Sequence, residues 1–562
     1  MPEYLLAVEG MTCEHCEEAI ESALGALGAE GPRADHRRGE VRFSLEGDPA
    51  AALEAVRAAG YRPGELSTGT EGDVAPRRPA PAGGPAGRRR DFDFVAVGSG
   101  SAAFAAAIRA SNLGARVAMV EAATVGGTCV NVGCIPSKAL LAAAEAYYRA
   151  GHHRFPGVAT AEMGVDWAGL VAGKTEIVTS LRKEKYLELA ESYGFEIVTG
   201  HAAFTGADRL GVEGRTLEAD AFLLATGSAP FVPAIPGLTG TGYLTSTTAM
   251  ELETLPESLV VIGGNYIGLE MGQLFADLGV KVTIVEARGR LAPAEEPEVS
   301  AWITRVLADQ GIEVLTGARV LGVEPTSPKP ASPKTASPKT VRVEVGGAHR
   351  ELRAAEILVA TGRRPVLDGL GLEVAGVGVD GQGRLVLDSQ LRTTNPAIWA
   401  AGDVTGAPQF VYVAAAQGTL AADNAVGGAA REMDYTALPR VTFTAPTIAA
   451  VGLTDEAAKA AGYDCECRVL DLVHVPRARV NRDTRGGVKV VAERGSGRVL
   501  GVSAVADGAG EVILAGVYAV KFGLSVADLA DTWAPYLTMA ESVKLAAQTF
   551  TTDVSKLSCC AA

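Results

Sequence analysis

The sequence predicts an α/β protein in which a small βαββαβ unit precedes a much larger multi-domain body. A strand, a glycine-rich turn and a helix follow one another twice in the chain, which is typical of parallel-sheet domains. Residues 67–90 are rich in Gly, Pro, Ala and Arg and predict a flexible linker. The length of 562 residues fits several domains of about 150 residues each.

Residues 1–66 carry the pattern of the small unit. Tyr4–Val8 and Val41–Leu45 are expected to be strands, and Glu17–Leu27 and Ala50–Ala59 are expected to be helices. This order predicts a ferredoxin-like βαββαβ domain that folds independently of the rest of the chain.

The first glycine-rich unit follows an apolar strand that begins at Phe92. Gly98 and Gly100 allow a tight turn, and the small residue Ala103 permits close packing of the next helix. Backbone N–H groups at such a helix N-terminus bind a pyrophosphate, and an acid about 20 residues further on, here Glu121, accepts from a ribose hydroxyl. The unit predicts a Rossmann-like dinucleotide-binding domain.

The second unit repeats this order with Gly263, Gly268 and the strand-ending acid Glu286, so we expect a second Rossmann-like domain. Asn265 departs from the pattern, because it stands where the middle glycine brings the backbone closest to the phosphate.

The choice of nicotinamide cofactor stays open at this point. Glu286 favours a free 2′-hydroxyl and therefore NADH, whereas Arg288 and Arg290 are close enough to pair with the 2′-phosphate of NADPH.

Three further glycine-containing turns follow apolar strands, at Ala225–Pro230, Ala360–Pro365 and Ala400–Asp403. A Ser-Pro-Lys repeat occupies Ser327–Thr340, and its proline content and positive charge predict a solvated hairpin insertion without a catalytic role.

The charge balance excludes several classes of function. The chain has 51 Lys and Arg against 66 Asp and Glu, a net charge of −15, which gives no support to nucleic-acid or anionic-membrane binding. The longest apolar runs, such as Val512–Val520, are shorter than the roughly 18 residues that span a bilayer. The N-terminus lacks the pattern of a secretion signal, so we expect a cytoplasmic protein without membrane insertion.

The eight cysteines are too few for a disulfide scaffold, but they fall into four close pairs, which suit soft-metal binding or redox exchange: Cys13 and Cys16, Cys129 and Cys134, Cys465 and Cys467, Cys559 and Cys560. The second pair is the strongest redox signal. Cys134 is expected at the start of a helix with Pro136 in its first turn, where the helix dipole stabilises a thiolate.

The motifs GSGSAA, GGTCVNVGCIPSK, ATGSAP, GGNYIGLE, ATGRRP and AAGDV occur in this order, and residues 91–562 resemble the flavin-dependent pyridine-nucleotide disulfide oxidoreductases. The resemblance implies an FAD-binding domain at 91–245 and 369–433, an NAD(P)-binding domain at 246–368, and a dimerisation domain at 434–562. It also implies a homodimer.

The resemblance assigns roles to individual residues. Cys134 would be the flavin-proximal thiol and Cys129 the distal one, with Lys138 and Glu270 near the flavin. The residues that would hold FAD are Gly98, Gly100, Ala103, Glu121, Gly227, Gly402 and Asp403, and those that would hold NADPH or NADH are Gly263, Gly268 and Glu286.

Disulfide-cleaving members of the family resemble one another in a C-terminal His-Pro-Thr-x-x-Glu stretch, whose histidine transfers a proton. This chain has Tyr536 at the histidine position and keeps the acid as Glu541, and its last histidine is His474. A phenol with a pKa near 10 is a poor base at pH 7 but a competent hydrogen-bond partner or oxygen ligand. By the resemblance, Tyr536, Tyr186 and Glu541 flank the reacting centre.

Cys13 and Cys16 lie in a Gly-Met-Thr-Cys-x-x-Cys loop that resembles heavy-metal-associated domains. Together with Tyr536 and the tail pair Cys559 and Cys560, this loop resembles the family members that reduce thiol-bound Hg(II) to Hg(0). The resemblance implies that these outer pairs capture Hg(II) from small thiols and pass it inward by ligand exchange, the tail pair coming from the partner subunit. Cys129 and Cys134 would then bind it, and NAD(P)H and FAD would supply two electrons.

Cys465 and Cys467 have no place in that scheme. A Cys-x-Cys puts both side chains on one face of a strand, so an accessory metal site is conceivable, but we expect ordinary dimerisation-domain residues.

Two alternatives remain open from the sequence. One is a disulfide reductase acting on glutathione or a dithiol such as lipoamide, with the tail pair as a redox shuttle. The other is a non-enzymatic metal chaperone, which Cys13 and Cys16 alone suggest.

Overall fold

The computed structural model describes residues 2–9, 11, 14–35, 39–68, 90–161, 164–326 and 338–557. The chain forms two compact units, Met1–Arg89 and Arg90–Ala562.

The first unit confirms the predicted βαββαβ order. Its antiparallel sheet has the strand order β2-β3-β1-β4, and its core includes the buried side chains of Leu6, Ile20 and Phe43. The elements are β1 (Glu3–Glu9), α1 (Glu14–Ala26), β2 (Glu30–Asp35), β3 (Glu40–Ser44), α2 (Ala50–Ala58) and β4 (Arg62–Thr68).

The last strand extends past residue 66, where the linker was expected to begin. Thr68 pairs with Tyr4 and Ser67 pairs with Leu5, because backbone hydrogen bonds continue the ladder whatever the side-chain composition. The rest of the predicted linker up to residue 89 lies outside the described residues.

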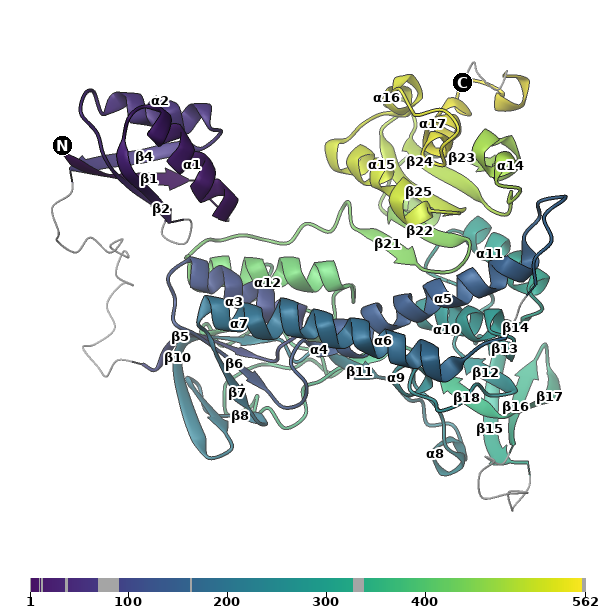
Figure 1. The fold of residues 1–562 in the computed structure, drawn as a ribbon. Coiled ribbons are helices and arrows are strands. Elements are labelled where there is room, and N and C mark those ends of the chain that lie inside the picture. The colour runs from purple at the N-terminus through teal and green to yellow at the C-terminus, as the bar shows by residue number, and fades with distance from the viewer. Residues whose placement is uncertain are drawn as a thin grey trace. The chain divides into compact units, whose positions relative to one another are not determined.

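The second unit begins with a sheet in the order β7-β6-β5-β10-β9-β8, in which β20 also pairs with β10. Strands β5, β6, β7, β10 and β20 are parallel, and β8, β9 and β10 form antiparallel pairs. Figure 1 shows the helices α3 and α12 side by side next to this sheet. The elements are β5 (Phe92–Val97), α3 (Ser101–Asn112), β6 (Val117–Glu121), β7 (Glu196–Thr199), β8 (Ala202–Gly206), β9 (Arg209–Val212), β10 (Arg215–Leu224), β20 (Ile398–Ala400) and α12 (Val411–Ala425).

A run of helices connects β6 to β7. The short helix α4 (Gly127–Asn131) leads into α5 (Cys134–His152), which pairs with α6 (Trp167–Arg182). One turn of π-helix, Lys183–Leu187, separates α6 from α7 (Glu188–Tyr193). Cys134 is therefore the first residue of a helix, as predicted.

The second predicted Rossmann-like unit is an all-parallel sheet in the order β14-β13-β12-β18. An antiparallel sheet of β15, β16 and β17 adjoins it. The elements are β12 (Ser258–Ile262), α10 (Tyr266–Asp277), β13 (Lys281–Val285), α11 (Pro297–Asp309), β14 (Glu313–Leu315), β15 (Ala318–Pro325), β16 (Lys339–Val345), β17 (Ala348–Ala354) and β18 (Glu356–Val359).

The Ser-Pro-Lys repeat connects β15 to β16, which pair as an antiparallel hairpin. Residues 327–337 lie outside the described residues. The end of the repeat is not solvated as predicted, because Lys339 and Thr340 are buried in β16 and Lys339 forms an ion pair with Glu356. Burial of a lysine is tolerated because this carboxylate partner balances its charge.

The C-terminal domain is a five-stranded antiparallel sheet in the order β21-β22-β25-β24-β23, with α15 and α17 packed against it. Its elements are β21 (Pro439–Thr442), β22 (Thr447–Gly452), α13 (Asp455–Ala460), β23 (Cys465–Asp471), α14 (Pro476–Val480), β24 (Gly487–Glu493), β25 (Val499–Ala506), α15 (Ala509–Phe522), α16 (Val526–Asp531) and α17 (Glu541–Gln548). Within the described ranges, no helix combines the length and the apolar character needed to span a bilayer.

Candidate active site

The turns that carry Cys129 and Cys134 lie directly on the first glycine-rich turn. Cys129 is in α4, and Cys134 is the first residue of α5. Gly127 has a positive φ of 65°, and a Cβ there would come within 2.5 Å of the Cα of Gly100. Only glycine permits this approach, so the close packing of two glycines brings the cysteine loop onto the predicted FAD turn.

The two thiols differ in their ease of ionisation. The pKa of Cys134 is lowered to about 7, first by a hydrogen bond from the Cys129 thiol and then by the Lys138 ammonium, while burial opposes the shift. The same hydrogen bond, together with burial, raises the pKa of Cys129. Near neutral pH the pair therefore holds a thiolate on Cys134 and a proton on Cys129, a state suited to attack on a soft electrophile.

Lys138 also connects this loop to the second Rossmann-like unit. Its ammonium lies 2.7 Å from Oε2 of Glu270 on α10, and 4.5 Å from the ring centroid of Phe443. Oε1 of Glu270 accepts a hydrogen bond of 2.9 Å from the backbone N–H of Phe443. One buried carboxylate thus ties the cysteine helix, the nucleotide helix and the C-terminal domain together.

Tyr186 lies beside the cysteine loop. A Cβ on Gly126 would come within 3.5 Å of its ring, and the ring packs edge-on against Phe104 with centroids 4.8 Å apart. Burial and the nearby Cys129 raise the pKa of the Tyr186 hydroxyl, so it remains a neutral phenol at pH 7. The π-helical turn that carries Tyr186 breaks the regular helix at this point, a feature that is frequent at functional sites.

The residues around the first turn fit a dinucleotide. Gly98 has a φ of 115° and packs so closely on the carbonyl of Ala225 that any Cβ would overlap it. Gly100 precedes α3, whose first-turn N–H groups are the donors that a pyrophosphate needs, and Ala103 is buried in that helix. Glu121 accepts from Ser99 Oγ at 2.5 Å and from the N–H of Ala123 at 2.7 Å.

The three glycine-containing turns of unassigned role come together here. The strand β11 (Ser228–Pro230), which follows Gly227, pairs with β19 (Arg363–Pro365). Ser228 Oγ donates to Asp403 at 2.6 Å and accepts from Arg363 Nε at 2.7 Å. Gly402, with a φ of 82°, packs against Ala102 of α3.

Ser228 and Arg363 were not identified as site residues from the sequence. Both lie inside the quoted Ala-Thr-Gly motifs, but nothing in those motifs signals that their strands pair. Arg363 is also linked electrostatically to Cys134, and burial lowers its pKa.

The second unit also fits a dinucleotide. Gly263 has a φ of 116°, and a Cβ on Gly268 would overlap the carbonyl oxygen of Gly263. Asn265, the predicted departure from the pattern, is the N-cap residue of α10, and its side-chain oxygen is buried without a hydrogen-bond partner among the described residues. An amide that can turn to present either its N–H or its oxygen at a helix N-terminus suits a ligand bearing phosphates and hydroxyls.

Glu286 is buried, and its carboxylate holds the turn together. Oε2 accepts from the N–H of Gly264 and Oε1 from the N–H of Arg288, each at 2.7 Å. Glu121 accepts from a backbone N–H two residues further on in the same way. The two acids share this contact, so it does not distinguish the nucleotide bound by the first unit from that bound by the second. Arg288, which is exposed, is the cation that follows Glu286 in the second unit.

The C-terminal candidates lie between α16 and α17 and at the start of α17. Tyr536 is 47% exposed in the connecting loop. Glu541 is the first residue of α17, and burial raises the pKa of its carboxyl, one oxygen of which has no partner within the described residues.

The outer cysteine pairs are only partly described. Cys16 lies in α1 and packs against the core of the first unit. Cys13, Cys559 and Cys560 lie outside the described residues, so their relation to Cys129 and Cys134 stays a prediction.

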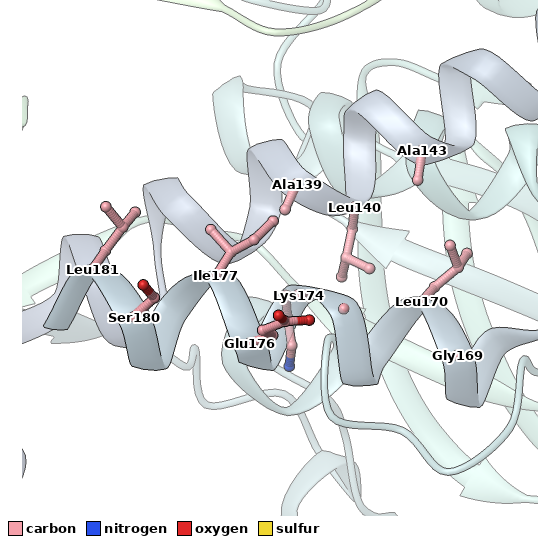
Figure 2. Close-up of a pocket in the computed structure, with 11 residues that line it drawn as sticks. Ala139, Leu140, Ala143, Gly169, Leu170, Lys174, Glu176, Ile177, Ser180 and Leu181 are labelled. Carbon is pink, nitrogen blue, oxygen red and sulfur yellow. The ribbon is translucent and has the colours of Figure 1, made fainter. Parts of the chain in front are cut away.

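An open apolar groove of about 680 Å³ runs between α5 and α6, as Figure 2 shows. Its lining is mostly aliphatic, and Figure 2 shows Leu170, Ile177 and Leu181 of α6 along it, opposite Ala139 and Ala143 of α5. The groove contains no cysteine, so it adjoins the redox helix without being part of the reacting centre.

Two family models match the chain. Residues 92–418 match the pyridine nucleotide-disulphide oxidoreductase family. Residues 438–547 match the dimerisation domain of the pyridine nucleotide-disulphide oxidoreductases.

The chain is similar to curated mercuric reductases. A mercuric reductase from Bacillus cereus is 47% identical over 563 aligned positions, covering 100% of this chain and 87% of the relative. A mercuric reductase from Streptomyces lividans is 54% identical, covering 84% of this chain and 98% of the relative.

Solved structures of flavoproteins share the fold. The flavoprotein disulfide reductase RclA from Escherichia coli, in its Cu(II) complex, has a TM-score of 0.72 and 31% identity, covering 83% of this chain and 100% of its own. LpdA from Mycobacterium tuberculosis has a TM-score of 0.71 and 26% identity, covering 82% of this chain and 100% of its own.

Proposed function

This chain belongs to the pyridine nucleotide-disulphide oxidoreductase family, and we propose from its similarity to mercuric reductases that it reduces thiol-bound Hg(II) to Hg(0) with electrons from NAD(P)H and FAD. The similarity to mercuric reductases extends over the whole chain. The observation that carries the proposal is the Cys129–Cys134 pair, which combines a thiolate and a thiol against the turn that fits FAD.

Ligand exchange at this pair follows from its protonation state. The Cys134 thiolate displaces one small thiolate from Hg(SR)₂, and Cys129 displaces the second, so that both sulfurs end bound to the metal. The proton of Cys129 leaves with one departing group, giving one RSH and one RS⁻, and charge is conserved. Lys138 stabilises the Cys134 thiolate before the exchange.

Reduction of the bound Hg(II) needs two electrons and groups that contact the metal. FAD held at the first glycine-rich turn would supply the two-electron chemistry, taking a hydride from NAD(P)H and passing two electrons to Hg(II). Once Hg(0) has left, Cys129 and Cys134 would both be thiolates, and one proton on Cys129 would restore the starting state. Tyr186, whose ring lies against Gly126 of the cysteine loop, is proposed to present its neutral hydroxyl to the metal. Glu541 and Tyr536 are assigned to the same centre by the resemblance alone.

Cofactor binding is assigned to the residues whose surroundings fit it. The FAD residues are Gly98, Gly100, Ala103, Glu121, Gly227, Gly402 and Asp403, and the nicotinamide nucleotide residues are Gly263, Gly268 and Glu286. Glu270 and Lys138 lie between the two sites. The exposed Arg288 beside a buried Glu286 supports NADPH as the preferred donor.

The outer pairs Cys13–Cys16 and Cys559–Cys560 are proposed to capture Hg(II) and to deliver it inward, the latter from the partner subunit. This proposal rests on the motifs. The intracellular reduced state that keeps such thiols available agrees with a cytoplasmic location.

A homodimer is proposed from the dimerisation-domain match and from one helix face. Leu514, Tyr518 and Phe522 follow one another at four-residue spacing on α15 and are 50%, 50% and 66% exposed. A contiguous apolar stripe of this kind is typical of a subunit contact.

The test is a comparison of oxidants with the purified FAD-containing protein. NADPH oxidation should depend on Hg(II) supplied with excess thiol, and should be slow with oxidised glutathione or lipoamide. Substituting Cys129 and Cys134 by serine should abolish the Hg(II)-dependent rate while FAD stays bound. Rapid disulfide turnover without an Hg(II)-dependent rate would replace the proposal with the disulfide reductase, and a protein without FAD would replace it with the metal chaperone.

A further inference from the structure

A second pair of thiols in the large unit converges on a single carboxylate oxygen. Cys465 and Cys467 are in β23, the edge strand of the C-terminal sheet (Figure 1). Their Sγ atoms lie 3.3 and 3.0 Å from Oδ1 of Asp455 on α13. The two sulfurs are therefore close neighbours, separated by no more than the sum of these two distances.

Oδ1 of Asp455 is the acceptor that both thiols share, and Cys465 Sγ also lies 3.9 Å from the backbone oxygen of Asp455. Oδ2 of Asp455 pairs instead with the exposed ammonium of Lys459, at 2.7 Å. The inner side of the thiol pair is apolar, because Cys465 packs with Ala458, Val491 and Leu500. The outer side is open, because the Asp455 side chain is 27% exposed.

We propose that Cys465 and Cys467 form a binding site for one soft, thiophilic cation such as Hg(II) or Cu(I), separate from the flavin-facing pair. Thiolates on one face of an edge strand present two soft ligands to the same point. Within the described ranges, no group of three or more His, Cys, Asp and Glu side chains is arranged to hold a metal. A two-ligand site of this kind suits cations that accept near-linear coordination by two sulfurs.

Binding replaces two protons by one cation. The two S–H bonds break, two sulfur–metal bonds form, and two protons pass to the solvent, so no oxidant or reductant is needed. Asp455, which accepts a hydrogen bond from each thiol in the free site, remains beside the cation as a negative charge.

Two lysines lie near the thiols, and each is held by carboxylates. Lys459 pairs with Asp455, and Lys489 pairs with Glu296 and Glu298. The ligands left for a cation are therefore the two sulfurs, which select a soft, thiophilic ion over the hard cations that prefer oxygen.

The first experiment measures binding and not catalysis. In the full FAD-containing chain, the other six cysteines are substituted by alanine, and the matched control carries Cys465→Ser and Cys467→Ser as well. FAD absorbance verifies folding of both. After equilibrium dialysis against Hg(II) with excess glutathione, the first protein should retain one Hg(II) per FAD and the control none.

Single substitutions test whether the two sulfurs act together. Cys465→Ser or Cys467→Ser should weaken Hg(II) retention by about 100-fold, because two linked ligands exceed one by such factors. Equal retention by the pair and by either single variant, or no retention by the pair, would overturn the proposal.

A second comparison avoids the sixfold substitution. Without NADPH, the otherwise unmodified chain should retain one more Hg(II) than its Cys465→Ser/Cys467→Ser variant, and both should reduce Hg(II) at the same rate when NADPH is added. Equal metal content would overturn the site. The result is independent of the proposed reductase activity, because retention is measured before any electron donor is present.

Discussion

Lys138 and Glu270 form an ion pair of 2.7 Å between the helix that begins at Cys134 and the helix that follows the second glycine-rich turn. The carboxylate is buried, and its other oxygen accepts from Phe443 of the C-terminal domain. The ion pair therefore orients the ammonium that stabilises the Cys134 thiolate, and it couples the redox loop to the nucleotide domain.

The reactivity of Cys134 should follow its lowered pKa. With the pair reduced, the rate of alkylation by iodoacetamide should rise with pH through about 7 and then level off, because the thiolate is the reacting form. In Lys138→Met the loss of the positive charge raises that pKa, and alkylation at pH 6.5 should slow by about threefold to tenfold. Peptide mapping of Cys134 by mass spectrometry measures the rate.

Lys281→Met is the matched control, because Lys281 is an exposed lysine at the start of β13. It should leave the alkylation profile unchanged. An identical profile in Lys138→Met and the parent protein would show that Lys138 does not stabilise the thiolate.

Removing the Tyr186 hydroxyl should slow metal reduction. Tyr186→Phe keeps the edge-on contact with Phe104 but loses the hydroxyl that is proposed to contact the metal, so kcat for Hg(II) should fall about tenfold. Tenfold corresponds to roughly 1.4 kcal/mol, close to the contribution of one hydrogen bond to a charged group. Flavin reduction by NADPH should not change. Stopped-flow absorbance separates the two steps.

Tyr193→Phe is the comparison for this substitution, since Tyr193 lies about two helix turns further on and packs against Phe195. Both variants should bind FAD fully. An equal loss of kcat in the two variants would assign the effect to helix packing and not to the metal centre.

A charge on the α15 stripe should separate the subunits. Phe522→Glu places a carboxylate in the proposed apolar contact, and burying it unpaired would cost several kcal/mol. Light scattering after size exclusion should give the mass of one chain. Hg(II) turnover should fall, because the tail pair is proposed to come from the partner subunit.

Val374→Glu is the control for that change, because Val374 is 59% exposed and lies in the predicted FAD-binding domain. It should remain a dimer with full activity. A dimeric Phe522→Glu protein would exclude this helix face as the contact.

Closing the second glycine-rich turn should block the nicotinamide nucleotide. In Gly268→Ala the added Cβ overlaps the carbonyl oxygen of Gly263, so the turn must shift, and displacements of about 1 Å can cost 100-fold in rate. Flavin reduction by NADPH should slow to this extent while FAD remains bound. Gly289→Ala, where the Cβ meets open space, should behave as the parent protein, and equal rates in the two variants would contradict the assignment.

Local patterns in the sequence predicted much of the fold and part of the site. Both glycine-rich turns follow strands and open helices as expected, and Cys134 begins α5. These features depend on residues within a few positions of one another, which sequence spacing records directly. Two departures, the buried end of the Ser-Pro-Lys repeat and the extension of β4 to Thr68, arose because strand pairing outweighed the local composition.

By itself, therefore, the sequence determined the α/β architecture, the two dinucleotide turns and the cysteine pairs that carry the chemistry. Only the tertiary structure decided that Tyr186 packs beside Gly126 of the cysteine loop, that Arg363 joins Ser228 and Asp403, and that two thiols of β23 share Asp455. The physical reason is that these contacts need elements distant in the chain to pack at a few ångströms. Such packing depends on the whole core and not on the spacing of any one motif.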